Sequence, residues 1–77
     1  MAKLPRITGK EMVSFLRRQG FQLVRVRGSH HYFERGATHT TVPVHGSRNL
    51  KIGTLRSVLR DIEISAAEFE QLLRDGG

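Results

Sequence analysis

The 77-residue sequence has no cysteine, no tryptophan and no long apolar run. Without cysteine the chain forms neither disulfides nor a thiolate metal site, which is typical of proteins in the reducing cytosol. No segment reaches the roughly 20 apolar residues that a transmembrane helix needs, and the N-terminal residues lack the apolar core of a secretory signal. We therefore expect a single domain over residues 1–77, cytoplasmic and with no membrane partner.

Acidic residues are scarce over most of the chain. The composition has 13 Lys and Arg against 7 Asp and Glu, which gives a net charge of +6 at pH 7. Residues 1–60 carry twelve basic and only two acidic side chains, whereas residues 61–77 carry one basic and five acidic side chains. A basic surface attracts polyanions because binding releases their condensed counterions. Charge thus favours a nucleic-acid partner, and by itself it equally allows a surface that only keeps the protein soluble.

Turn-forming and capping residues divide the chain into short elements. A capping box at residues 8–11 (TGKE) begins a helix over 9–19, which Gly20 ends in the left-handed conformation. Runs rich in β-branched and aromatic residues predict strands at residues 21–27, 30–35 and 38–44. A polar loop follows, then helical spacing after Gly53 and a second capping box at residues 65–68.

The resulting order, α-β-β-β-α(α), predicts an α+β fold. Three short strands joined by tight turns form a three-stranded antiparallel sheet, and the helices pack on one face because a sheet needs an apolar cover on at least one side. The opposite face is left open to solvent or RNA. The same order describes the double-stranded-RNA-binding domain, which recognises RNA by its shape and its phosphates.

Side chains alternate between the two faces of a strand, which separates the adjacent histidines. In the second strand, His30 and Tyr32 lie on one face, and His31 and Phe33 lie on the other. Phe33 is the better core residue because it has no hydroxyl group to satisfy, so His30 is the exposed imidazole; the assignment reverses if Tyr32 is the buried aromatic. In the first strand the same alternation assigns to one face Val24 and Val26, and to the other Leu23, Arg25 and Arg27.

An exposed histidine beside arginines suits the cleavage of RNA. The 2′-hydroxyl must lose a proton to attack the neighbouring phosphate, and the 5′-oxygen must gain one to leave; an imidazole that titrates near neutrality can do either. Arg and Lys side chains neutralise the phosphate as charge develops on it. The candidate catalytic residue is His30, and the candidate RNA-binding residues are Arg25, Arg27, Ser29, Tyr32, His45, Arg48 and Lys51.

The same residues also suit simpler roles. On spacing alone, His30 and His31 are better explained as ordinary surface residues of a strand, some of which contact phosphate. The alternative function is a non-catalytic RNA-binding module whose histidines only contact phosphate. A zinc site formed by His30, His39 and His45 is less favoured, because the chain has no cysteine and no close ligand spacing. No acidic cluster near the basic residues could hold Mg²⁺, so we expect neither a metal nor another cofactor.

Five short segments carry a resemblance to a known family. They are, in order, residues 3–11 (KLPRITGKE), 20–21 (GF), 28–31 (GSHH), 42–45 (VPVH) and 53–55 (GTL). Together, and at this spacing, they resemble the HicA toxins, the small mRNA interferases of the HicA/HicB toxin–antitoxin systems. The resemblance covers the chain from Lys3 to about Leu73.

The resemblance implies a double-stranded-RNA-binding-like fold and metal-independent cleavage of mRNA, which inhibits translation and growth. It also implies a cognate HicB-like antitoxin as partner, and we expect the free toxin to be monomeric. The catalytic histidine of the family directly follows Gly-Ser, which corresponds to His30 here. The aromatic residue three positions later matches Phe33, and His45 matches a second recurrent histidine, for which binding or structural support is the expected role.

The chain departs from the family pattern at several places. It has Arg48-Asn49 where a Lys-Glu pair is frequent, Ile52 where proline is common, and Glu63 where glycine is usual. The first departure puts the loop's contacts with RNA or antitoxin in doubt, but none affects His30. A third hypothesis therefore stands beside the ribonuclease and the RNA-binding module, namely an inactivated toxin that only binds its antitoxin.

Overall fold

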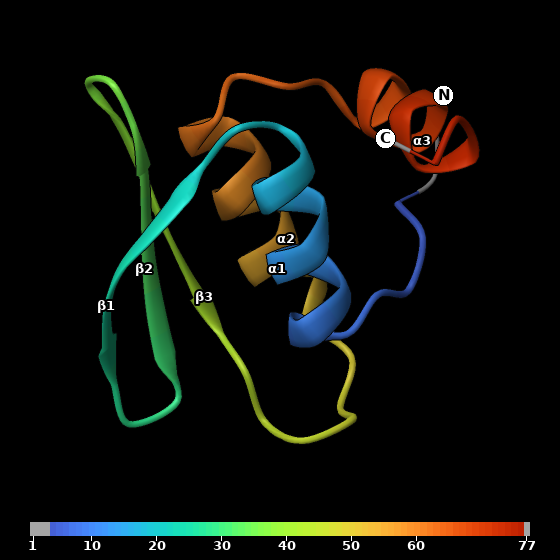
Figure 1. Ribbon diagram of the computed structural model, residues 1–77. Coiled ribbons are helices and arrows are strands. Elements are labelled where there is room, and N and C mark those ends of the chain that lie inside the picture. Colours follow the sequence, from blue (N-terminus) through green and yellow to red (C-terminus); the bar gives the residue numbers. More distant parts are fainter. Residues whose placement is uncertain (1–3, 77) are drawn as a thin grey trace.

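The computed structural model describes residues 4–76 (Figure 1). The elements are α1 (Gly9–Arg18), β1 (Gln22–Arg27), β2 (His30–Arg35), β3 (Thr38–Pro43), α2 (Ile52–Asp61) and α3 (Ala66–Arg74). This order is the predicted α-β-β-β-α(α), with boundaries within two residues of the expected ones where these were given. Lys3, the first residue of the family-like segments, lies outside the described residues.

The three strands form one open antiparallel sheet in the order β1-β2-β3, and the helices lie on one side of it (Figure 1). Both α1 and α2 contact β3, and α1 also contacts β1. The third helix packs on the side of the helices away from the sheet, where the Phe69 and Phe15 rings form a T-shaped contact with their centroids 4.9 Å apart. The fold is therefore the predicted double-stranded-RNA-binding-like α+β fold, with one sheet face left open.

Helix α1 begins where the sequence predicts, and its first residue touches the sheet. The Thr8 side chain accepts a hydrogen bond from the Glu11 amide, and the Glu11 side chain accepts one from the Thr8 amide, which completes the capping box. Gly9 is buried against the end of β3. A Cβ atom added there would lie 2.5 Å from the Pro43 carbonyl oxygen and 3.0 Å from Val44 Cα. Only glycine allows this close approach between α1 and β3.

Helices α1 and α2 end in the same hydrogen-bonded motif with different residues at its left-handed position. After α1, the amide of Phe21 donates to the Leu16 carbonyl, and Gly20 between them has φ +90°. After α2, the amide of Ile64 donates to the carbonyl of Leu59 in the same way, but the left-handed residue is Glu63, with φ 59°. The glutamate is strained there, because a side chain in this conformation crowds the following carbonyl oxygen.

The prediction for the faces of β1 is wrong at Leu23. A bulge between Leu23 and Arg25 shifts the register, so that Leu23 lies opposite Phe33 and packs against the core, while Arg25 lies opposite Tyr32 on the open face. Strict alternation would have placed Leu23 and Arg25 on the same side. Val24 is the extra residue of the bulge: it has no partner in β2, and its side chain is half-exposed.

Candidate nucleic-acid interface

His30 is the first residue of β2 and lies on the sheet face that the helices leave open. Its cross-strand neighbours are Arg27 in β1 and Pro43 in β3, and directly opposite residues project from the same face. His30 is exposed, whereas Phe33 is only 1% exposed. The predicted exposure of His30 and burial of Phe33 are both confirmed.

The next cross-strand pair on the open face consists of an arginine and the single tyrosine of the chain. Arg25 lies opposite Tyr32, and its guanidinium carbon is 5.9 Å from the centroid of the tyrosine ring. This distance is within the range of cation–π attraction, which holds the exposed guanidinium near the ring. The structure thus brings Arg25, Arg27, His30 and Tyr32 together in two adjacent rows.

His31 points away from this face and has a structural role. It lies opposite Val42, which is fully buried, and its Nδ1 atom is 3.1 Å from the Ser29 carbonyl oxygen. Because a carbonyl oxygen only accepts, Nδ1 must carry the proton in this contact. The same carbonyl accepts a hydrogen bond from the Val44 amide at 2.8 Å. Ser29 therefore ties the start of β2 to the end of β3 through its backbone.

The remaining predicted residues gather around a cavity beside the open face. His45, Arg48 and Lys51 line a cavity of about 320 Å³ together with Pro43, Asn49, Leu50 and Thr54. Pro43 connects the two parts of the surface, because it lines this cavity and is also the cross-strand neighbour of His30. Sequence reasoning did not identify Pro43, Asn49 or Thr54. Pro43 could have been found by counting residues across the two-residue turn between β2 and β3.

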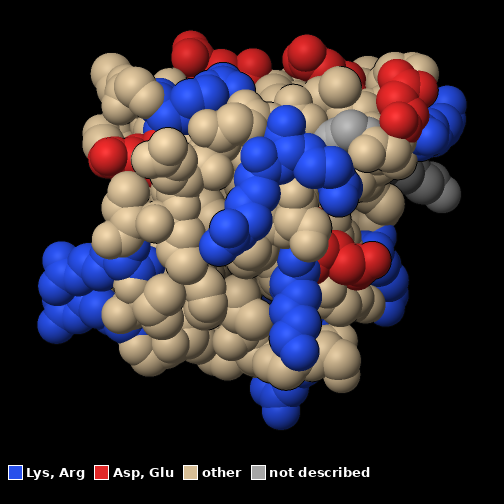
Figure 2. All heavy atoms as spheres, viewed as in Figure 1, with Lys and Arg blue, Asp and Glu red and all other residues tan. Residues whose placement is uncertain are grey.

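The acidic residues are concentrated toward one end of the molecule, whereas the basic residues are spread more widely. In Figure 2 most Asp and Glu side chains lie along the top, near the connection from α2 to α3 and α3 itself, while Lys and Arg side chains are spread over the sides, the middle and the bottom of this face. Ion pairs among residues 4–76 are limited to His39 with Glu34 and Arg74 with Glu70. The arginines of the open sheet face and the cations of the cavity therefore have no carboxylate partner within the described residues.

The three histidines of the weaker zinc hypothesis are not brought together. His39 lies opposite Glu34 near the other end of β2 from His30, and its Nδ1 atom is 3.6 Å from the Glu34 carboxylate. Within the part of the chain that the structure describes, no three His, Cys, Asp or Glu side chains are grouped to hold a metal ion.

None of the helices described is long and apolar enough to cross a membrane.

A three-stranded sheet with helices on one face and a basic open face defines a small domain of the double-stranded-RNA-binding-like class. Residues 9–64, well over half of the chain, match the family described as the HicA toxin of bacterial toxin–antitoxin systems. The chain therefore belongs to the HicA toxin family, whose members pair with HicB antitoxins. It has the role of a toxin in such a system. A search of curated proteins finds no match.

Proposed function

We propose that this toxin is an endoribonuclease that cleaves mRNA with His30 as its proton-transfer group and without a metal ion. The observation that carries the proposal is the position of His30, exposed on the open face between Arg27 and the cavity wall formed by Pro43. The proposal also includes action in the cytoplasm, where mRNA is found, by a monomeric free toxin.

The proposed reaction is an attack of the RNA strand on itself. His30 takes the proton of the 2′-hydroxyl, the 2′-oxygen forms a bond to phosphorus, and the bond from phosphorus to the 5′-oxygen breaks. The leaving 5′-oxygen receives a proton from the imidazolium, so the products are a 2′,3′-cyclic phosphate and a 5′-hydroxyl end. Proton transfer by one imidazole contributes about 10²–10⁴-fold to the rate, which is sufficient for a slow nuclease.

The neighbours of His30 supply charge and binding area in this proposal. Arg27 lies directly opposite His30 and can neutralise the phosphate as negative charge develops on its oxygens. Arg25 and Tyr32 form the next row, where the ring offers a base a stacking surface. Ser29 borders the site at the start of β2, and we assign the outer contacts with the strand to the cavity residues His45, Arg48 and Lys51.

The test compares three proteins on labelled mRNA in the presence of EDTA. We expect the wild type to cut and His30→Ala to lose at least about 100-fold in rate. The matched control is His39→Ala, which removes an exposed imidazole from the far end of the same face and should leave the rate near that of the wild type. Equal rates for His30→Ala and the wild type would exclude His30 from catalysis. A wild-type protein that binds RNA without cutting it would favour the non-catalytic module.

We also propose that the HicB-like antitoxin neutralises the toxin by covering the basic open face and His30. The net positive charge of residues 1–60 favours an acidic partner surface. Chemical modification of histidines measures this directly: the reactivity of His30 in the complex should fall well below its reactivity in the free toxin. An inhibited complex in which His30 still reacts would place neutralisation at another surface.

A further inference from the structure

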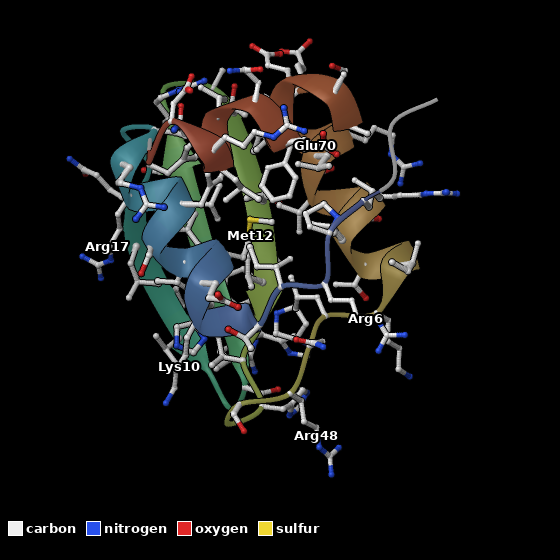
Figure 3. The ribbon with its side chains drawn as sticks, turned by 90° about the vertical axis from the view of Figure 1, so that its right-hand side faces the viewer. Arg6, Lys10, Met12, Arg17, Arg48 and Glu70 are labelled. Atoms are coloured by element: carbon white, nitrogen blue, oxygen red, sulfur yellow. The ribbon has the colours of Figure 1, made fainter. Side chains whose placement is uncertain are left out.

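The cavity beside the open face has the chemistry of an anion site. Seven residues line it, none of them acidic, and two of them, Arg48 and Lys51, are cations. Neither cation forms an ion pair with any residue in the described range 4–76. Pro43 and Leu50 supply apolar wall, and Thr54 supplies a hydroxyl. Figure 3 shows Arg48 at the opposite end of the molecule from Glu70 of α3.

The loop that carries these cations is held in place by the rest of the fold. At its start, the Val44 amide donates to the Ser29 carbonyl at 2.8 Å, and at its end the Leu50 amide donates to the Ile7 carbonyl at 2.7 Å. Asn49 forms an isolated bridge with Thr8, just before α1. Because the backbone is fixed at both ends, a ligand that enters the cavity does not have to order the loop.

We infer that this cavity binds the phosphate and part of the sugar of a second nucleotide, adjacent in the RNA strand to the nucleotide whose phosphate is cut at His30. The inference rests on the proposed ribonuclease function. The cavity has a volume of about 320 Å³, which is at the lower end of the range for small-ligand sites. It therefore accommodates about one nucleotide unit rather than a longer segment. Pro43 is shared by the two sites, since it lies opposite His30 and lines the cavity.

A consequence is that an efficient substrate needs two phosphates: the phosphodiester that is cleaved at His30 and a second phosphate that binds in the cavity. The kinetic test uses a dinucleotide with a single phosphodiester and the same dinucleotide carrying an additional terminal phosphate at its 5′ or its 3′ end. For the wild type, one of the two additions should raise kcat/KM by about tenfold at low salt, because a second charge-assisted contact is gained. The quantity compared between proteins is this ratio of kcat/KM values, which cancels any general loss of activity.

The test variant is Arg48→Gln/Lys51→Gln, and the control is Arg17→Gln/Arg56→Gln, which removes the same charge from exposed helix positions outside the cavity (Arg17 in Figure 3). In the test variant the ratio should fall from about ten to about one, whereas the control should keep it, since long-range electrostatics change equally in both. A ratio that stays near ten in the test variant would overturn the inference.

A binding experiment separates this inference from the ribonuclease proposal. Adenosine 3′,5′-bisphosphate has no phosphodiester to cut, and its addition to the wild type should give saturable NMR shifts at the amides of Asn49, Lys51 and Thr54. The shifts should saturate at lower concentration than with inorganic phosphate and disappear in the test variant. If the wild type cuts neither labelled mRNA nor the dinucleotides, the ribonuclease proposal fails and this binding experiment alone decides the inference. Shifts confined to the cavity support the nucleotide site, and their absence refutes it.

Discussion

Replacing Gly9 by alanine tests the close approach between α1 and the end of β3. An alanine Cβ at this position would lie 2.5 Å from the carbonyl oxygen of Pro43 and 3.0 Å from Val44 Cα. Both contacts are with backbone atoms, which cannot rotate away as a side chain can. Either α1 or the end of β3 has to shift, and Pro43 is the residue that borders both His30 and the cavity.

Two opposing free-energy terms determine the outcome. Alanine in a helix is favoured over glycine by about 0.5–1 kcal/mol, largely because glycine loses more conformational freedom on folding. Overpacking in a filled site costs about 1–3 kcal/mol. We therefore expect Gly9→Ala to lower the free energy of unfolding by about 1–2 kcal/mol and the Tm by about 5–10 °C.

Gly53→Ala is the matched control. Gly53 also lies in the first turn of a helix, but an added Cβ there would meet no atom within 4 Å. Only the favourable term remains, so this variant should be more stable than the wild type by about 0.5 kcal/mol. Urea unfolding followed by far-ultraviolet circular dichroism is the appropriate assay, because the chain has no tryptophan to report by fluorescence. Equal stabilisation of both variants would refute the steric argument.

Three further predictions concern stability and charge. Glu63→Gly should raise the free energy of unfolding by about 0.5–1 kcal/mol in the same urea assay, because relief of the left-handed strain exceeds the entropy lost by glycine; a loss of stability would mean that Glu63 makes a compensating contact. Thr8→Ala should cost about 1 kcal/mol by removing the cap of α1, and an unchanged urea midpoint would contradict this. In the His30→Ala background, Arg25→Gln/Arg27→Gln should reduce the slope of log affinity for single-stranded RNA against log salt by about 1.4; an unchanged slope in fluorescence anisotropy titrations would remove both arginines from the interface.

Local sequence determined the elements and most of the strand register. The capping box at Thr8 begins α1 as predicted, and α3 begins at the predicted Ser65, where only the bond from the Glu68 amide to the serine hydroxyl forms. In both cases the side chain accepts an amide hydrogen bond that a helix start leaves unsatisfied. Two-residue turns join the strands, so Arg27 pairs with His30 and Arg35 with Thr38. From there the pairing of His30 with Pro43 follows by counting.

Tertiary packing decided what local patterns could not. Leu23 turns toward the core, opposite Phe33, because burying its side chain under the helices is favourable, and the bulge at Val24 returns Arg25 to solvent. The cavity forms only when the loop after β3 is tied to Ser29 and Ile7, residues remote from it in the chain. The sequence by itself thus determined that His30 is exposed and that the chain is rich in cations. The tertiary structure placed Arg48 and Lys51 around one cavity that shares Pro43 with His30, because their spacing depends on contacts between distant segments.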